Sequence, residues 1–435
     1  MAQIHVPREI PVRYVPRGGA ALFGVMALAG AGAFGFALTL DAQTAWASYV
    51  ANWLFFTSVA MGAVVFSVVT TIVKARWNWS VRRISVSFAA FLPIAFLLFL
   101  PMLLFLREGY FPWIEAMEAD PILQRKAAYL NVPFLVSRQL VGVLALFGIS
   151  LYFAYLAVRP DLGLVGEPDE GGDARRAAWR ARFTGGWLGQ EAEEVRSWHR
   201  MSTLAPALAI VYAVVMSFVA YDWAMTLEPH WFSTLFGGWF FMGAFWGGIA
   251  STALASVWLR GRDPELRHHI GLQQRHDLGK LSFAFCVFWA YLFWSQYIVI
   301  WYGKLPWEQA WIIHRSVQPW GALSALAIVF CFIVPFAGLL GRAPKLDPRW
   351  LGGFTTVILG GLWLERYLLV APSLWHEGDP VFPWYHPVIA LGFLGVFLGS
   401  LRWAWSTFPV LQMWQAPTPA EMLEAEKPGS TSPAR

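Results

Sequence analysis

Ten long apolar runs constrain the fold of this chain more than any other feature of its sequence. Each run is long enough for a helix that crosses a bilayer, which needs about 20 residues. Backbone polar groups inside a bilayer have to bond to one another, so each run is predicted to be a helix. The runs lie near residues 20–40, 50–73, 85–106, 134–158, 203–226, 234–259, 279–302, 319–341, 351–371 and 387–408. The sequence therefore predicts an all-α polytopic membrane protein with ten transmembrane helices.

The loop charges predict an orientation. Lysine and arginine are concentrated before the first run and in the loops that follow the second, sixth and eighth runs, while the alternate loops hold few of them. By the positive-inside rule, both termini are expected to be cytoplasmic. The net charge of +5 is then a signal of topology and not of nucleic-acid binding. The first run is too long for the core of a signal peptide, so we expect it to be an anchor.

An internal repeat divides the predicted helices into two sets. Three groups of residues recur at identical spacing: Trp53, Lys74 and Arg76 with Trp239, Arg260 and Arg262; Arg83, Ser85 and Phe91 with Lys280, Ser282 and Phe288; and Asp222 and Pro229 with Glu365 and Pro372. Matches in register indicate a parallel repeat, as in several transporter folds. We therefore expect two four-helix bundles of the same direction, helices 2–5 and 6–9, flanked by helices 1 and 10.

The segments outside the apolar runs complete the predicted organisation. We expect a cytoplasmic N-terminal segment at 1–19, the first helix and a loop at 20–49, the first bundle at 50–226 with a cytoplasmic loop at 159–202, the second bundle at 227–371, the last loop and tenth helix at 372–415, and a disordered cytoplasmic tail at 416–435. The charged loop at 159–202 is interpreted as a solvated connector, with a docking surface for a partner as the alternative.

The sequence offers few residues that could bind a redox centre. All nine histidines are predicted in loops or at helix ends, whereas a membrane haem needs imidazoles that face inward from helices. The two cysteines are too few for an iron–sulfur cluster, which takes four thiolates. Glycine-rich nucleotide motifs and zinc-protease motifs are missing from the sequence as well. We expect the chain to hold no cofactor or metal of its own.

Buried polar residues are the remaining candidates for function. Asp222 lies within the fifth apolar run, and a charge at that depth costs at least about 2.5 kcal/mol, so such residues usually have a functional partner. A carboxyl group held out of water can take up and release protons, as in the relays of pumps. The predicted proton path comprises Asp222, Glu365, Gln296, Arg138, Arg366, Asn52, Lys304, His230, His276, Asp277 and Lys280.

Each of these residues also has a structural interpretation. Asp222 and Glu365 could each be held permanently by an arginine or by helix-end amides. Neighbours on a helix face different ways, so Glu365 and Arg366 are expected to find other partners. Asp277, before the seventh helix, is favoured as a complement to the helix dipole over a proton entrance. His230 is expected to be an interfacial residue.

Seven short runs carry a resemblance to a known family, at residues 222–223, 228–234, 276–280, 289–291, 295–297, 300–302 and 363–367. Together they resemble the NrfD/polysulfide-reductase-type membrane subunits of bacterial alternative complex III. The resemblance spans helices 2 to 9, and the size suits the smaller, ActF-type subunit of that complex.

The resemblance implies a multi-pass subunit of the bacterial inner membrane with two four-helix bundles and no bound cofactor. Its complex would be a quinol:electron-acceptor oxidoreductase, with cytochrome c or a similar acceptor. The implied partners are a sister NrfD-like membrane subunit, an iron–sulfur subunit and subunits with c-type haem. The chain would contribute proton conduction and scaffold and would not be catalytic alone, with quinol binding left open. The alternatives are a stand-alone secondary transporter, which predicts interrupted helices at matching positions, and a purely structural anchor.

Overall fold

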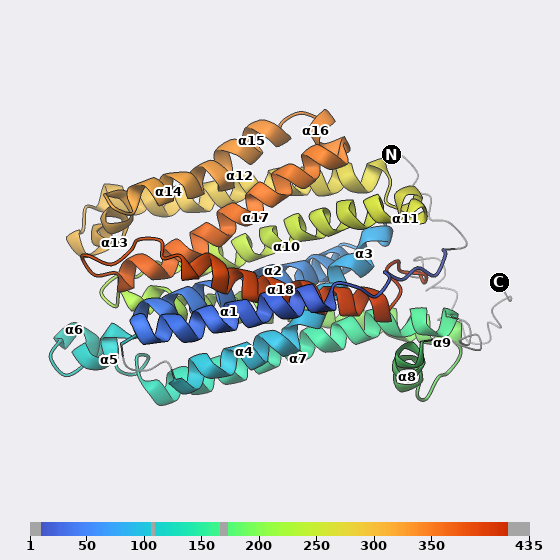
Figure 1. Cartoon of the computed structure of the whole chain (residues 1–435), viewed down its shortest axis with the longest axis horizontal. Coiled ribbons are helices and arrows are strands. Elements are labelled where there is room, and N and C mark those ends of the chain that lie inside the picture. Colours follow the sequence, from blue (N-terminus) through green and yellow to red (C-terminus); the bar gives the residue numbers. More distant parts are fainter. Residues whose placement is uncertain (1–9, 106–108, 166–172, 416–435) are drawn as a thin grey trace.

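The computed structural model describes residues 10–105, 109–165 and 173–415, and within these ranges the chain forms helices and no strands. The helices run along the long axis of an elongated body (Figure 1). Ten spans are long and apolar enough to cross a membrane. They are Ala20–Leu40, Ala42–Ile72, Trp79–Phe105, Val132–Leu164, Gln190–Leu227, Thr234–Arg262, Leu272–Gly303, Gly321–Leu339, Pro348–Leu374 and Tyr385–Thr407. The predicted class, all-α with ten membrane-length helices, is confirmed.

The spans are built from the following helices. The first half contains α1 (Ala20–Leu40), α2 (Ala42–Ile72), α3 (Trp79–Val86), η1 (Ser87–Phe91), α4 (Leu92–Phe105), α5 (Pro112–Ala116), α6 (Pro121–Arg125), α7 (Val132–Leu164), α8 (Ala174–Phe183), α9 (Gln190–Trp223) and η2 (Met225–Leu227). The second half contains α10 (Thr234–Arg262), α11 (Pro264–His269), α12 (Leu272–Gly303), α13 (Pro306–Ser316), α14 (Gly321–Ile328), η3 (Val329–Ile333), α15 (Val334–Leu339), α16 (Ala343–Leu346), α17 (Pro348–Val370), η4 (Ala371–Leu374) and α18 (Tyr385–Thr407).

Two predicted loops are largely helical. Asp41 alone separates α1 from α2, and its carboxylate caps α2 by accepting from Gln43 N at 3.0 Å and Thr44 N at 3.2 Å. This one capping residue connects the two helices, so the loop predicted at 41–49 is instead the first part of α2. The predicted connector at 159–202 contains the end of α7, all of α8 and the first turns of α9. Its charged residues pair across α7 and α9, which extends both helices beyond their apolar runs.

Helices α2 and α10 cross at the centre of the molecule with their main chains in contact. A Cβ on Gly62 would lie 1.9 Å from Ala244 O, and a Cβ on Gly248 would lie 2.0 Å from Gly62 C. Only glycine permits such an approach, as in small-residue contacts of membrane helices. Gly62 and Gly248 stand the same number of residues after Trp53 and Trp239, the first matched pair of the internal repeat. The contact thus joins two residues that are equivalent in the proposed repeat.

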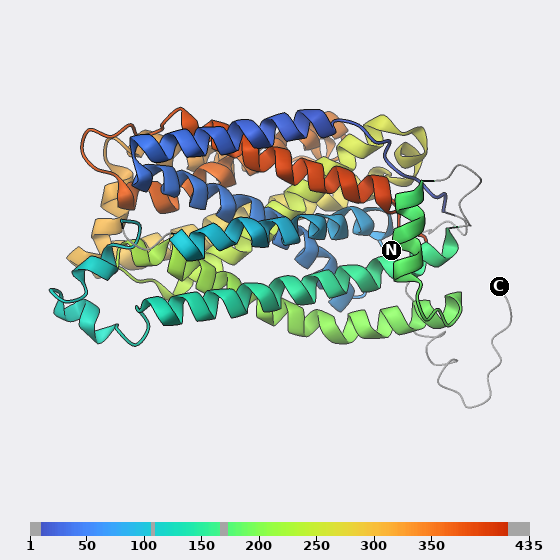
Figure 2. The same cartoon turned by 60° about the horizontal axis from the view of Figure 1, so that its bottom comes forward.

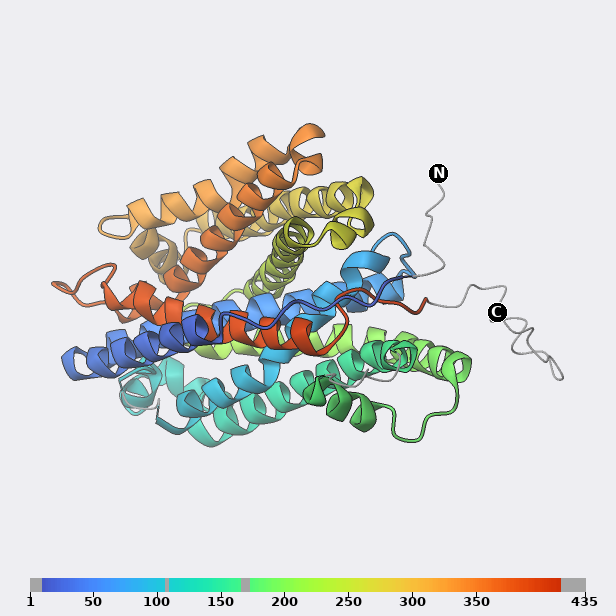
Figure 3. The ribbon, with the colours of Figure 1, turned by 45° about the vertical axis from the view of Figure 1, so that its right-hand side comes forward.

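The remaining spans pack around this central pair. Helix α2 contacts α4, α9 and η1, and α7 packs on α9, while α10 contacts α12 and α17, and α14 packs on α17. Helices α1 and α18 pack along each other on one side (Figures 2 and 3). These neighbours agree with two bundles and two flanking helices, although α2 also contacts α17. The division into bundles therefore stays a prediction.

The two described ends of the chain are tied together. Val15 N donates to Trp405 O at 2.9 Å, and Val410 N donates to Arg13 O at 2.8 Å. Both ends consequently lie at the same end of the helix bundle, as an even number of spans requires. The orientation in a membrane stays a prediction. Residues 1–9 of the predicted N-terminal segment and the predicted tail at 416–435 lie outside the described residues.

Candidate functional site

Asp222 is fully buried at the end of α9 and is held by side chains from the start of α7. Arg138 forms a paired interaction with it, with Nε 2.8 Å from Oδ2 and Nη2 2.7 Å from Oδ1. The Tyr129 hydroxyl donates to Oδ1 at 2.9 Å, and the Gln139 amide donates to Oδ2. The two carboxylate oxygens thus accept four hydrogen bonds, two of them from a guanidinium. The sequence predicted the burial of Asp222 and named Arg138 as a candidate, and the structure brings the two together.

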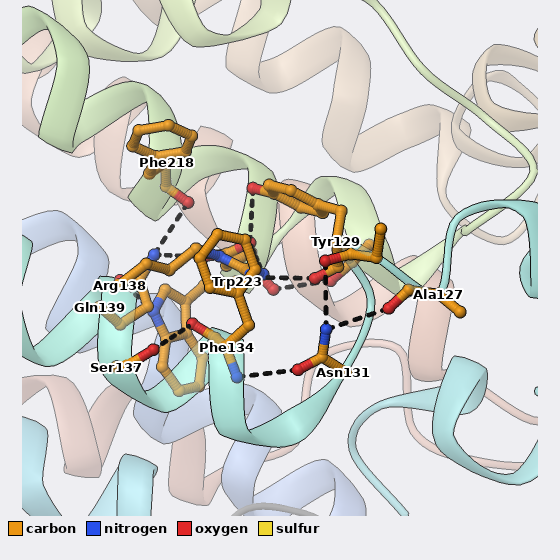
Figure 4. Close-up of polar contacts among 12 residues, drawn as sticks. Ala127, Tyr129, Asn131, Phe134, Ser137, Arg138, Gln139, Phe218 and Trp223 are labelled. Atoms are coloured by element: carbon orange, nitrogen blue, oxygen red, sulfur yellow. Dashed lines mark hydrogen bonds and ion pairs between the residues drawn. The ribbon is translucent and has the colours of Figure 1, made fainter.

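The turn before α7 positions these donors (Figure 4). Asn131 caps the helix by accepting from Phe134 N at 2.9 Å, and Arg138 Nη1 donates to Tyr129 O at 2.8 Å. The guanidinium lies 3.9 Å from the centre of the Tyr129 ring. Tyr129 lies just before the fourth span. Burial and the nearby Asp222 carboxylate raise the pKa of its hydroxyl, so the hydroxyl is protonated and acts as a donor at neutral pH. Asp222 is held by a guanidinium, which was the structural alternative considered above.

Glu365 on α17 has a different environment from Asp222, its counterpart in the repeat. The residue is 4% exposed, and its only hydrogen bond among the described residues comes from Arg366 Nη1 to Oε1 at 2.7 Å. The expectation that Glu365 and Arg366 point to different partners was wrong. Helical spacing fixes the direction of Cβ, but the long arginine side chain bends back to the adjacent acid. Arg366 Nη2 also donates to Phe240 O at 3.0 Å, and the guanidinium lies over the Phe240 ring.

Unpaired polar atoms also occur around Arg366, the partner of Glu365. Within the described parts of the chain, Glu365 Oε2, Arg366 Nε and the indole nitrogens of Trp239 and Trp289 are buried without a hydrogen-bond partner. The two indole rings are 5.9 Å apart, and a Cβ on Gly243 would lie 3.3 Å from Arg366 Nη2 and 3.8 Å from Trp289 Nε1. Buried polar atoms of this kind are those that internal water molecules usually bind.

A π-helical turn faces the same part of α17. The eighth span changes from α14 to the π-helical segment η3 before continuing as α15. Cys331 in η3 is fully buried, and a Cβ on Gly361, one turn before Glu365, would lie 2.8 Å from Cys331 Sγ. Cys286 Sγ donates to Cys331 O at 3.4 Å. Such turns often occur at functional sites because they displace backbone carbonyls from the regular helical ladder.

Asn52 and Gln296 are buried, as expected, but each makes local or interhelical bonds. Asn52 donates to Ser48 O at 2.8 Å and accepts from Trp363 Nε1 at 2.9 Å, which joins α2 to α17. Gln296 accepts from Ser233 Oγ at 3.1 Å. Within the described part of the chain, neither residue bonds to Asp222 or Glu365.

The candidates at the helix ends are more exposed. Lys304 is an exposed residue that ends α12 in the left-handed conformation, with φ of 51°. His230 is exposed and pairs with Asp120, which joins the segment after α9 to the loop that contains α6. Because α12 begins at Leu272, His276 and Asp277 lie inside its first turns and do not precede it. Asp277 pairs with Lys280 at 2.6 Å, a local contact that favours the structural interpretation.

The sequence analysis missed the burial of two acids, described here, and of one histidine, described in the next paragraph. Asp161 is fully buried in an ion pair with Arg83 and also accepts from Met413 N at 2.8 Å. Glu193, assigned to a solvated connector, is 1% exposed and pairs with Arg159. The position of Arg83 beside the third apolar run was a usable signal, because a charge at such a position usually has a partner.

His386 lies at a helix end, as predicted, in the first turn of α18, but the sequence analysis missed that it is fully buried. Its ring stacks on Trp363 at 5.0 Å and lies 4.1 Å from that of Tyr367. Neither of its ring nitrogens has a hydrogen-bond partner among the described residues.

The described residues contain no group of three or more histidine, cysteine, aspartate or glutamate side chains placed to hold a metal ion. The chain matches no protein-family model and no curated protein.

Proposed function

We propose that this chain is a membrane subunit of a quinol:electron-acceptor oxidoreductase complex, carrying no redox cofactor itself and contributing proton transfer through Glu365 and a scaffold. The proposed partners are a sister membrane subunit, an iron–sulfur subunit and c-type cytochrome subunits. Support for the complex comes from the sequence runs that resemble such subunits. The proposed setting is a bacterial inner membrane with both termini cytoplasmic, which is what the distribution of loop charges favours.

The observation that carries the proton-transfer role is the unpaired oxygen of Glu365. Oε2 is buried and has no donor among the described residues, while Arg366 bonds to Oε1 alone. A proton can therefore be added to Oε2 without breaking an existing hydrogen bond. Carboxyl groups inside membrane bundles that face polar neighbours commonly act in proton relays. The unpaired indole and guanidinium nitrogens nearby supply positions for water molecules that would deliver the proton.

Asp222 is less suited to this role than its repeat counterpart. Protonation at either oxygen would weaken bonds from Arg138, Tyr129 or Gln139. Removing the charge would also leave the buried guanidinium without its counter-ion, which costs several kcal/mol, roughly 3–5 in soluble proteins. We therefore assign Asp222 to holding α7 against α9 and confine the proton-transfer role to Glu365.

A secondary transporter is a weaker interpretation of the same fold. It predicts interrupted helices at equivalent places in both repeats. The third span is interrupted by η1, whereas the seventh span, its repeat counterpart, is the continuous helix α12. The eighth span is interrupted by η3, and the fourth span is the single helix α7. These two interruptions within spans have no counterpart in the other repeat; what the repeats share is a short 3-10 segment at the ends of the fifth and ninth spans, η2 and η4.

The test uses Glu365→Gln in the intact complex purified from its native membrane and reconstituted in vesicles. Quinol oxidation and proton movement are measured together, the latter with a pH-sensitive dye. The amide keeps the bond from Arg366 but cannot carry a proton, so we expect normal assembly and a reduced number of protons moved per electron. Glu115→Gln, an exposed position on α5, is the matched control.

The two parts of the proposal fail in different ways. Unchanged proton movement per electron in Glu365→Gln would remove the relay and leave the chain as an anchor. Purification of the native protein without subunits that bear haem or iron–sulfur clusters would refute membership of the complex.

A further inference from the structure

A cavity of ≈ 240 Å³ opens between α7 and the first turns of α9. Its lining comes from the end of α7, the segment after α8 and the first turns of α9, whereas Asp222 lies at the other end of α9. Figure 1 shows α8 at the opposite end of the molecule from α5 and α6. Its charged lining residues are Arg159, Glu193, Arg196 and Arg200. Three arginines and one glutamate leave an excess of two positive charges in the cavity.

Arg159 builds the cavity and has no hydrogen-bonding capacity left for a ligand. It pairs with Glu193 through Nε at 2.7 Å and Nη2 at 2.9 Å. Its other donors bond to the Tyr155 hydroxyl, Phe183 O and the carbonyls of Gly185 and Gly186. The carbonyls that line the cavity are thus directed at Arg159, and the charge of Arg159 is balanced by Glu193.

Arg196 and Arg200 supply the excess charge. They are one helical turn apart on α9 and therefore lie on the same face. Arg196 is 42% exposed and stands 3.9 Å from Glu193, beyond hydrogen-bond distance, and Arg200 donates to the Tyr152 hydroxyl at 3.3 Å. Both guanidinium groups have donors to spare, and arginine binds phosphate oxygens in the same forked geometry that it uses for carboxylates.

The cavity lies where an apolar surface begins. The apolar run of α9 starts near Thr203, one turn after Arg200. Beyond it, large apolar side chains are exposed on both helices: Val141, Leu144 and Leu151 on α7, and Ile210, Val214 and Phe218 on α9. A ligand with a phosphate at one end and hydrocarbon chains at the other would match both features. Basic pockets between membrane helices at the bilayer surface are known to hold lipid head groups.

We propose that this cavity binds the phosphate group of an anionic phospholipid, with the acyl chains lying along the exposed faces of α7 and α9. Inorganic phosphate shares the recognised chemistry but lacks the chains. The proposal is independent of the proposed function, because none of these residues contributes to the surroundings of Glu365 described above.

The test compares the wild-type full chain with Arg196→Gln/Arg200→Gln. The proteins are exchanged from detergent into nanodiscs of phosphatidylcholine with a small fraction of phosphatidylglycerol, and retained lipid is counted by native mass spectrometry. We expect the double variant to bind phosphatidylglycerol about 30-fold more weakly, since each arginine near an anionic surface contributes about fivefold. Arg182→Gln/Arg267→Gln removes two exposed arginines outside the cavity and should bind as wild type does.

Two further arms separate the possible outcomes. Arg196→Lys/Arg200→Lys keeps the charge and should retain most of the binding, with an unchanged melting temperature for all variants. Equal retention of phosphatidylglycerol by Arg196→Gln/Arg200→Gln and wild type would overturn the site. Displacement of the lipid by millimolar inorganic phosphate would overturn the assignment to lipid and indicate a free-phosphate site.

Discussion

The ion pair of Arg138 and Asp222 provides the sharpest test of the architecture. Arg138→Leu removes two charge-assisted hydrogen bonds, which contribute about 1.5–3 kcal/mol each. Among the described residues, the buried carboxylate then keeps Tyr129 and Gln139 as donors. Breaking one side of a buried pair costs about 3–5 kcal/mol in soluble proteins, and we expect a loss of that size. Asp222→Leu leaves the guanidinium unpaired and should cost a similar amount.

The double variant Arg138→Leu/Asp222→Leu should be much less destabilised than the sum of its parts. With both charges replaced by apolar side chains, neither partner leaves an uncompensated ion at this site. We expect a coupling energy of about 2–4 kcal/mol, measured by equilibrium unfolding in mixed dodecylmaltoside and SDS micelles and followed by tryptophan fluorescence. Arg125→Leu, an exposed position on α6, controls for the loss of an arginine.

The size of the coupling decides whether this reasoning holds. Polar contacts between membrane helices average about 0.6 kcal/mol in such cycles and reach about 1.7. A coupling within that range would mean that the unfolded chain satisfies these groups nearly as well as the native one does. The assignment of Asp222 as the residue that holds α7 to α9 would then be refuted.

Three further predictions concern helix packing, the pH dependence of stability and the segment after α18. Gly62→Val should prevent stable folding, because its Cβ would lie 1.9 Å from a carbonyl oxygen of α10, whereas Gly32→Val, with open space around it, should leave the melting temperature nearly unchanged. Burial and the neighbouring Arg315 lower the pKa of His314 below 6.5, so the unfolded chain binds the proton more readily; stability should fall as pH drops below 6.5, and His314→Gln should reduce that fall in melting scans. Asp161→Ala removes the acceptor of two backbone N–H groups in the segment after α18, and hydrogen exchange there should quicken while α1 is unaffected.

The spans were predictable because burial in a bilayer leaves the backbone no alternative to a helix. The burial of Asp222 was predictable for a related reason, because an acid within an apolar run needs a polar partner. Arg138 was among the candidate residues named from the sequence. The residues at which the helices begin were less predictable. The start of α2 depends on the capping geometry of Asp41, and the start of α9 depends on the pairing of Glu193 with a residue of another helix.

The errors have a common physical origin in contacts between distant segments. Asp161 reads as a loop residue until the segment after α18 folds over it and its backbone donates to the carboxylate. Among the described residues, Arg366 forms an ion pair with Glu365 and with no other acid, and spacing along one helix does not reveal such a pairing. The difference between Glu365 and Asp222 in hydrogen bonding could not be derived from a repeat that makes them equivalent.

The crossing of α2 and α10 limits how this molecule can change shape. Where side chains separate two helices, rotamer changes allow them to slide or twist, but at Gly62 and Gly248 peptide groups abut directly. The pair should therefore move as one rigid unit in any conformational change. The outlying spans would then have to move relative to this central pair, because the two helices cannot slide past each other where their peptide groups touch.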